Sequence, residues 1–347
     1  MRGSGRPARG PVKHAMIPAS LHSAQPADWR AAWRDAVTDP AELLRLLDLP
    51  QLAARLAAAG GFPLRVPRGF VARMRRGDAA DPLLRQVLPL DDEDRIVPGF
   101  GLDAVGDLAA RGARGVLHKY HGRALLVATG ACAIHCRYCF RRHFPYGEEA
   151  AAANGWQSAL DYMRGDPSID EVLLSGGDPL SLSTPKLADL TDALRTVPHL
   201  RRLRIHTRLP VVLPERIDAA LLDWFGALPW PVVLVIHANH ANELDDSVAA
   251  ALAALARRGV RLYNQAVLLR GVNDDEDALV DLSTRLFELG VQPYYLHQLD
   301  RVAGTAHFEV DDVRALALVE RVRARLPGYL VPQLVREVPG AASKTPI

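Results

Sequence analysis

Two patterns of apolar residues divide the chain. In the first part, apolar residues recur at helical spacing over 29–49, with Asp39-Pro40 as a break. A second apolar stretch covers 52–59 and ends at Gly60-Gly61, which is a helix-stop signal. Residues 77–102 are rich in Asp, Pro and Gly, so they predict a mostly irregular connection. This part of the chain is therefore expected to be helical and irregular.

From residue 124 onward, short apolar runs alternate with amphipathic helical stretches. Strands joined by helices are typical of βαβ units and a parallel sheet. The runs are almost continuously apolar, as expected for strands that are buried on both faces. The expected strands are 124–129, 172–175, 203–207, 232–237, 262–269 and 293–299. The expected helices include 185–196, 215–227, 245–258, 275–289 and 311–326.

Polar residues cluster where the expected strands end. A cysteine motif follows the first strand, Gly176-Gly177-Asp178 the second and His206 to Arg208 the third. His237 to His240 follow the fourth strand and His297 to Asp300 the sixth, and Gln265 lies within the fifth. In a β/α barrel these ends form the active-site face, and a doubly wound sheet also binds ligands there. Six units without an obvious dinucleotide-binding fingerprint favour an α/β fold built as an incomplete (β/α)6-type barrel.

Four regions are expected along the chain. We predict a disordered arm over 1–27, a helical accessory region over 28–115, the partial barrel over 116–327 and a C-terminal tail over 328–347. The first fifteen residues are basic and lack an apolar core, so they do not resemble a secretory signal. A translation start at Met16 is an alternative explanation of this arm.

Composition limits the classes of function. Of the 347 residues, 49% are hydrophobic, which is enough for a sizeable core. The net charge of +2 argues against binding to nucleic acid or to a membrane surface. No apolar run approaches the ~18 residues of a transmembrane helix. An odd number of cysteines, three, fits a reducing compartment and predicts a cytoplasmic protein. Whether the chain forms a homo-oligomer stays open.

The cysteines form one motif. Cys132, Cys136 and Cys139 are all the cysteines of the chain, and they lie within eight residues on the loop after the first expected strand. Three such thiolates can converge on one metal centre. A zinc site would need a fourth ligand, for which His135 or His143 is available. A cubane iron–sulfur cluster normally takes four cysteines, so three would leave one iron open for the amino and carboxylate groups of S-adenosylmethionine (SAM). The pattern favours the cluster, with zinc as the alternative.

A longer string is more specific. CRYCFRRHFPY over 136–146 resembles the lysine 2,3-aminomutase family of radical SAM enzymes, and within it the EpmB-like branch that serves translation elongation factor P. The similarity continues through SGGDPL, RLPVVLPERI, HANHANE, NQAVLLRGVND and PYYLHQLD. The chain is also shorter than the aminomutases that act for free-lysine metabolism, as the branch requires.

The resemblance implies an isomerase that converts L-α-lysine to β-lysine. It implies three cofactors, namely a 4Fe-4S cluster held by the cysteines, SAM and pyridoxal 5′-phosphate (PLP). Reduced flavodoxin or ferredoxin would supply the electron, and an elongation factor P ligase would take the product. Two alternatives remain, a radical SAM aminomutase for another amino acid and a non-enzymatic metal-binding protein.

PLP needs a lysine partner, and the chain has few candidates. Lys13 lies in the arm, and Lys186 is expected to be solvated at a helix start. Lys119 and Lys344 remain, and the resemblance places the PLP lysine at Lys344, although a lysine so near the end of the chain could also be frayed. The resemblance implies three further residues near PLP, namely Lys119, Tyr120 and Arg123.

The resemblance also implies how SAM and the substrate are held. Arg141 would bind the substrate carboxylate, and Asp300 and Glu337 would hold the ε-ammonium. Glu337 replaces an aspartate of the free-lysine enzymes, which leaves pocket length and product stereochemistry open. The SAM site would involve Gly176, Gly177, Asp178 and His237, with His240 nearby, and we expect Gln265 to contact a cofactor. The structural alternatives are a tight turn at the glycines, a metal pair at His237 and His240, core packing at Tyr120 and His297, and solvated surface charges at Arg141, Arg142, Asp300 and Glu337.

Overall fold

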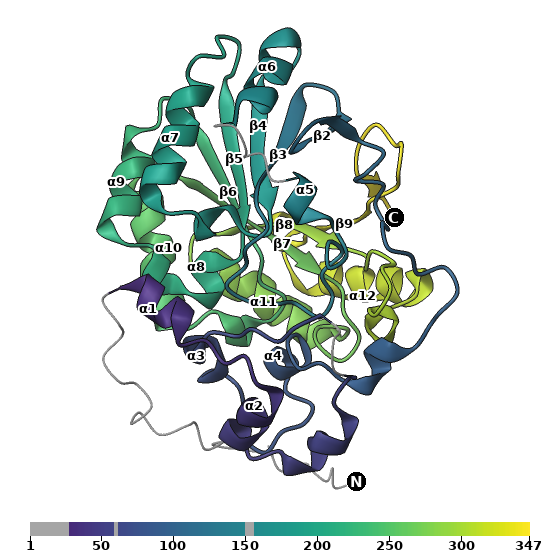
Figure 1. Ribbon diagram of the computed structural model, residues 1–347. Coiled ribbons are helices and arrows are strands. Elements are labelled where there is room, and N and C mark those ends of the chain that lie inside the picture. The colour runs from purple at the N-terminus through teal and green to yellow at the C-terminus, as the bar shows by residue number, and fades with distance from the viewer. Residues whose placement is uncertain (1–27, 59–61, 150–155) are drawn as a thin grey trace, which may run out of the picture.

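The computed structural model describes residues 28–58, 62–149 and 156–347 (Figure 1). Within these residues, ten strands form one open sheet in the order of the sequence. β3 to β9 are parallel to one another, while β1, β2 and β10 are antiparallel to their neighbours. The strands are β1 (Arg111–Ala113), β2 (Val116–Tyr120), β3 (Arg123–Thr129), β4 (Glu171–Gly176), β5 (Arg202–Thr207), β6 (Val232–Ile236), β7 (Arg261–Val267), β8 (Gln292–His297), β9 (Gln333–Arg336) and β10 (Thr345–Pro346).

Helices cover the outer face of this sheet, as Figure 1 shows for α7, α9 and α10. The connecting and covering helices are α5 (Tyr146–Glu149), α6 (Gln157–Gly165), α7 (Thr184–Leu194), α8 (Leu209–Val212), α9 (Ala219–Ala227), α10 (Asp246–Arg257), α11 (Glu276–Glu288) and α12 (Asp312–Arg325). Asp245, Asp275 and Asp311 cap three of them, each accepting a hydrogen bond from a main-chain N–H of the first turn. The expected incomplete α/β barrel is therefore confirmed.

Burial alternates along the strands because the two faces of the sheet differ. Leu174 of β4 and Ile205 of β5 are fully buried beneath the helices. Their neighbours Leu173, Ser175 and His206 instead line a cavity on the inner face. The expectation of strands packed on both faces therefore holds only for the residues of the outer face, since those of the inner face line the cavity.

The six expected strands correspond to β3 to β8, with ends that differ by at most two residues. The sequence analysis did not anticipate β1, β2, β9 or β10. β9 continues the parallel series, because Tyr295 and Leu296 of β8 pair with Gln333 and Leu334. The helix expected over 215–227 begins only at Ala219, after a 3-10 turn, because Asp218 caps it.

The N-terminal region packs against one end of the barrel beside α8 and α10 (Figure 1). The Nη1 of Arg73 donates to the carbonyl oxygens of Val211 and Glu243, at 2.7 and 2.5 Å. Its helices are α1 (Trp29–Arg34), α2 (Pro40–Leu47), α3 (Arg68–Val71) and α4 (Pro82–Arg85), with 3-10 helices at η2 (Pro50–Arg55) and η3 (Asp91–Asp94). The break at Asp39-Pro40 is confirmed, since Asp39 caps α2.

One expectation for the N-terminal region is wrong, and others concern residues that the structure does not describe. The apolar stretch over 52–59 does not form one helix: a 3-10 helix ends at Arg55, and Leu56 bridges to Leu90. The stop signal at Gly60-Gly61 and the arm over 1–27, with its alternative start at Met16, lie outside the described residues. Among the helices of the described residues, none has the length and apolar character needed to cross a membrane.

Candidate active site

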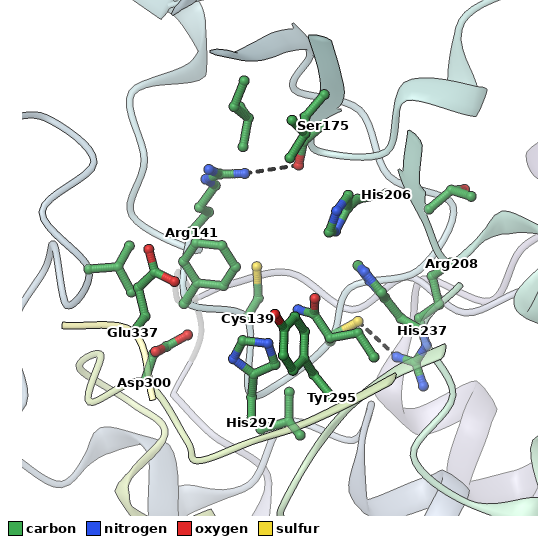
Figure 2. Close-up of a pocket in the computed structure, with 18 of the residues that line it drawn as sticks. Cys139, Arg141, Ser175, His206, Arg208, His237, Tyr295, His297, Asp300 and Glu337 are labelled. Atoms are coloured by element: carbon green, nitrogen blue, oxygen red, sulfur yellow. Dashed lines mark hydrogen bonds between the residues drawn. The ribbon is translucent and has the colours of Figure 1, made fainter. Parts of the chain in front are cut away.

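A cavity of about 630 Å³ opens at the carboxyl ends of the parallel strands. Every strand from β2 to β9, or the loop after it, contributes to its lining. Figure 2 shows charged, aromatic and sulfur-containing side chains converging there, among them Cys139, Arg141, His206 and Asp300. The prediction that the polar residues after the strands share one face is confirmed. Large cavities with a few convergent polar groups are the usual binding sites of cofactors.

The three cysteines lie together in this lining. Cys132, Cys136 and Cys139 are free thiols on the loop after β3. Burial, with the charges of the neighbouring sulfurs, raises the pKa of Cys139 to about 11 and that of Cys132 well above its usual range. A bound metal reverses this preference, because it binds the thiolate and neutralises its charge. The donor set therefore fits a metal centre.

The geometry gives no fourth ligand for the zinc alternative. The His135 Nδ1 lies 3.0 Å from the carbonyl oxygen of Pro63, and the His143 Nε2 lies 3.2 Å from that of Ala303. Neither histidine lines the cavity. In the described part of the chain, no three His, Cys, Asp or Glu side chains are arranged so that they could hold a single metal ion. In a cubane each cysteine binds a different iron, so this spacing suits a cluster better than zinc.

The N-terminal region fixes the cysteine loop. Arg137, which is buried, donates from Nε to the Oε1 of Glu93 at 2.6 Å, and its main-chain N–H donates to the carbonyl oxygen of Gln86 at 2.9 Å. Arg142 shares the same carboxylate at 2.7 Å. Arg141 is buried as well, so the alternative of a solvated pair at Arg141 and Arg142 is wrong.

Arg208 joins this loop to the barrel. Its Nη1 donates to the Sγ of Cys136 at 2.8 Å, which Figure 2 marks with a dashed line. Its Nη2 donates to Gln86 Oε1 at 2.6 Å and to Glu243 Oε2 at 2.9 Å. A cationic donor therefore lies against one of the three sulfurs.

Gly176 and Gly177 allow β4 to end against the cysteine loop. Gly176 has a φ of +121°, and a Cβ on it would lie 2.5 Å from the carbonyl oxygen of Thr129. A Cβ on Gly177 would lie 2.5 Å from the carbonyl oxygen of Ala131. Two glycines are needed here because two main chains cross closely, so this is more than the plain turn of the alternative.

Asp178 follows these glycines and ties two loops together. It accepts hydrogen bonds from Thr207 Oγ1 at 2.7 Å and from the main-chain N–H groups of Arg208 and Leu209 at 2.7 and 3.2 Å. Burial raises its pKa to about 6, although these donors favour the carboxylate. Asp178 lines the cavity, but its oxygens are already engaged by the chain.

Five side chains of the lining have polar atoms without a hydrogen-bond partner among the described residues: the Nε2 atoms of His206, His237 and His297, the Oε1 of Gln265 and the Nε of Arg208. Such atoms are rare in native interiors and costly, so they mark where a bound molecule supplies the missing partners. Burial lowers the pKa of His237 to about 4, and those of His206 and His297 are also well below the usual range. These imidazoles are therefore neutral groups in the lining of the cavity.

His240 has a different role. It does not line the cavity, and its Nδ1 accepts a hydrogen bond from the N–H of Asn242 at 3.1 Å. It caps the 3-10 helix η7 (Ala241–Glu243). Both the expected place near SAM and the alternative of a metal pair with His237 are therefore wrong for His240. The alternative of a satisfied core residue is also wrong for His297, whose Nε2 has no described partner.

The C-terminal tail brings a lysine back into the cavity. After a turn at Gly340, which has a φ of +79°, β10 pairs with β9. Lys344 Nζ donates to Glu337 Oε2 at 2.8 Å, and Tyr120 OH donates to Glu337 Oε1 at 2.6 Å. All three residues line the cavity, so the alternatives of a frayed lysine, a surface glutamate and an ordinary core tyrosine are wrong.

Two further cations are held by one buried carboxylate. The Nζ of Lys119 lies 2.7 Å from Asp107 Oδ1, and the Nε of Arg141 donates to Asp107 Oδ2 at 2.6 Å. Arg141 Nη1 also donates to Ser175 Oγ at 3.1 Å (Figure 2). The guanidinium of Arg123 lies 4.5 Å from the centre of the Tyr120 ring. A cluster of cations therefore surrounds this part of the cavity, which suits anionic groups.

Asp300 differs from the other acids of the cavity. No residue in the described ranges donates a hydrogen bond to its carboxylate, and burial raises its pKa to about 7. A carboxylate without a protein partner in such a place is ready for a cationic ligand. The surface alternative is therefore wrong for Asp300.

Comparison with known proteins agrees with this geometry. The model of a family described as "4Fe-4S single cluster domain" matches residues 121–203, which contain the cysteine loop. The chain is 49% identical to "L-lysine 2,3-aminomutase" of Escherichia coli (strain K12), over 94% of this chain and 96% of that protein. The chain belongs to the lysine 2,3-aminomutase family. It is therefore a member of a family of radical SAM isomerases, as the cysteine string indicated.

Among more distant members of the family, the share of the relative's length that aligns with this chain varies. The "L-lysine 2,3-aminomutase" of Haemophilus influenzae is 44% identical over 92% of this chain and 95% of that protein. The one of Clostridium subterminale is 33% identical over 92% of this chain but only 77% of that protein. The lysine 2,3-aminomutase family thus contains members that match this chain nearly from end to end and longer ones.

Several lining residues were missed by the sequence analysis, including Asp107, Ser175, Arg204 and Tyr295. The period-two alternation within β4 and β5 could have found Ser175 and Arg204, since they share a face with Leu173 and His206. Asp107 lies in an irregular segment, and no local pattern distinguishes it from other aspartates there.

Proposed function

We propose that this chain converts L-α-lysine to β-lysine. The observation that supports this most is that one cavity holds three cysteine thiols, a lysine amine, a guanidinium and an unpartnered carboxylate. The family membership supplies the reaction class, and the cavity has groups suited to both ends of a lysine molecule.

Two cofactors fit the donor sets. Cys132, Cys136 and Cys139 would hold a 4Fe-4S cluster with one iron left for SAM, and Lys344 would hold PLP. When bound, the reduced cluster would cleave SAM to give the reactive radical, and PLP would carry the nitrogen that moves. The unpartnered atoms of His237 and Gln265 would bind polar groups of SAM or PLP. Gly176 and Gly177 bring the main chain close to the SAM site.

The cations have roles towards anionic groups. Lys119 and Arg123 lie beside Tyr120 and would bind the PLP phosphate, with the Tyr120 ring against the cofactor. Arg141 would bind the substrate carboxylate. Asp107 and Ser175 hold its Nε and Nη1, so its orientation is fixed before the substrate arrives.

The two acids would hold the ε-ammonium of the substrate. Asp300 has no partner in the described structure, whereas Glu337 bonds to Lys344 and Tyr120. Among the described residues, the Oε2 of Glu337 accepts a hydrogen bond from Lys344 alone, so a second lone pair of this oxygen would be open to the substrate ammonium. The acidic pair would exclude amino acids with an anionic side chain.

We further propose that the product serves elongation factor P. The chain spans 96% of the Escherichia coli relative and only 77% of the longer Clostridium one, as expected for the branch that supplies a ligase. Reduced flavodoxin or ferredoxin would be the electron donor, and a cytoplasmic location would suit three free thiols.

Turnover by the reconstituted protein tests the proposal. The protein would be purified without oxygen, loaded with iron, sulfide and PLP, and incubated with SAM, dithionite and a panel of amino acids. Lysine should give β-lysine, whereas ornithine, arginine and glutamate should not react. A different preferred amino acid would replace lysine in this proposal, and a colourless zinc protein without 5′-deoxyadenosine formation would refute it.

A further inference from the structure

We propose that Arg208 is a positioning residue for the iron–sulfur cluster, and that its hydrogen bond to Cys136 raises the reduction potential of that cluster. This inference rests on the cluster of the proposed function. It adds a residue that controls how readily the electron enters, which neither the cysteine motif nor the residues around PLP address.

The contact involves one specific sulfur. Arg208 is the first residue after β5, and its Nη1 lies 2.8 Å from the Sγ of Cys136 (Figure 2). Tyr138, whose ring centre lies 5.7 Å from the guanidinium, is another polar neighbour of this thiol. Hydrogen bonds to the sulfurs of a cluster are among the factors that set its potential.

The guanidinium is fixed on its other side. Its Nη2 donates to Gln86 Oε1 at 2.6 Å and to Glu243 Oε2 at 2.9 Å, and the side chain is 6% exposed. Gln86 comes from the N-terminal region and Glu243 from the loop after β6. Two separate parts of the fold therefore hold Arg208 against the sulfur, so the hydrogen bond is already formed before the cluster is reduced.

The sign of the effect follows from the charge change. Reduction adds one electron to the cluster and no proton, so the cysteine sulfur becomes a stronger hydrogen-bond acceptor. A buried cation that donates to this sulfur stabilises the reduced state more than the oxidised state, because water screens it little. Glu243 opposes this effect, since its carboxylate lies against the same guanidinium.

Redox titrations of the complete protein test this inference. The fraction of reduced cluster would be followed by electron paramagnetic resonance, without SAM, with iron and sulfide measured in each sample. In Arg208→Gln the midpoint should shift to a more negative value, so that clearly less than half of its cluster is reduced at the wild-type midpoint. Arg208→Lys should lie between the two proteins, because it keeps the charge. Arg258→Gln is the control and should keep the wild-type midpoint, since Arg258 is exposed and bonds to Asp223 outside the cavity.

The opposite shift in a second variant separates a specific effect from damage. Glu243→Gln removes the negative charge beside Arg208, so its midpoint should become less negative than that of the wild type. If Arg208→Gln retains no cluster, the direction of the midpoint shift in Glu243→Gln decides whether the inference holds. An unchanged midpoint in cluster-loaded Arg208→Gln, or a negative shift in Glu243→Gln, would overturn the inference. A wild-type protein without any cluster would instead refute the proposed function.

Discussion

The Nζ of Lys344 lies 2.8 Å from the Oε2 of Glu337, seven residues earlier in the chain. The pair places the only amine of the tail inside the cavity, next to the Tyr120 hydroxyl that bonds to the same carboxylate. We therefore predict that borohydride reduction of the PLP-loaded protein attaches a pyridoxyl group to Lys344. Peptide mass spectrometry would locate the label.

Two variants control this labelling experiment. Lys344→Arg should lose the label, and Lys186→Arg should keep it, because Lys186 is exposed on α7 far along the chain from the tail. A pyridoxyl group on Lys119 or Lys186 of the wild-type protein would contradict the assignment of the tail.

Removing one cysteine should abolish SAM cleavage without unfolding the protein. Cys136→Ala leaves two thiols, too few to retain a three-cysteine cluster, while the barrel core is made by the strands and their helices. We expect no 5′-deoxyadenosine, loss of the brown colour and a nearly unchanged circular dichroism spectrum. Cys132→Ala and Cys139→Ala should behave alike. Wild-type amounts of 5′-deoxyadenosine from any of the three would rule out the radical SAM assignment of this loop.

Asp300 should control turnover of lysine rather than assembly of the cofactors. Asp300→Asn removes the unpartnered carboxylate, so the substrate ammonium would be buried without an anion. Losing one partner of a buried charge pair costs about 2–5 kcal/mol, or roughly 30- to 5,000-fold in kcat/KM. Glu337→Gln should lose less. Asp161→Asn, on the exposed face of α6, is the control. Near wild-type kcat/KM in Asp300→Asn would show that this acid does not hold the substrate.

The same carboxyl group predicts a pH dependence. Burial raises the pKa of Asp300 to about 7, so at pH 6 most of it is neutral in the substrate-free protein. Only the ionised form attracts the lysine ammonium, so kcat/KM for lysine should rise as the pH increases through about 7. Asp300→Asn should lose this rise, which steady-state rates at several pH values would reveal.

The neutral histidines of the cavity should make stability depend on pH. Burial, aided by Arg208 and Lys344, lowers the pKa of His237 from 6.5 to about 4. The folded state therefore binds the proton more weakly than the unfolded state. Neutral His237 therefore contributes about 3 kcal/mol to the free energy of unfolding. This contribution is fully present above pH 6.5 and is lost as the pH falls from there to about 4.

Denaturant unfolding of the cofactor-free protein at several pH values measures this effect. His237→Gln should flatten the decrease in the free energy of unfolding between pH 6.5 and 4, compared with the wild type. Parallel curves for the two proteins would show that His237 is not held neutral.

The barrel could be predicted because its strands are apolar and four of its helices, α9 to α12, begin with aspartate caps, both of which are local signals. β9 and β10 could not, because both are short and are defined by long-range pairing, of β9 with β8 and of β10 with β9. Local sequence also misplaced the helix start at Glu215, where the Asp218 cap came later.

The site shows the same division. The cysteines could be found because three thiols within eight residues of one loop can bind one metal centre, whatever the rest of the fold. The tail lysine was found through resemblance alone, since its position depends on a turn at Gly340 and on pairing with β9. His206 and Arg208 could be placed on the active-site face, because they lie at the end of a strand. The hydrogen bond from Arg208 to Cys136 could not be predicted, nor could that from Arg141 to Asp107, because each joins residues far apart in the sequence. Such contacts leave no pattern in a single sequence.

The hydrogen bonds between the cysteine loop and the N-terminal region have a consequence for a protein whose cluster would be lost to oxygen. Arg137 and Gln86 hold this loop through protein contacts alone, so its ordering is achieved when the chain folds. If oxidation destroyed the cluster, the cysteine loop would therefore keep the conformation needed to bind a new one. Repair would then require only fresh iron, sulfide and reduced thiols, without refolding of the enzyme.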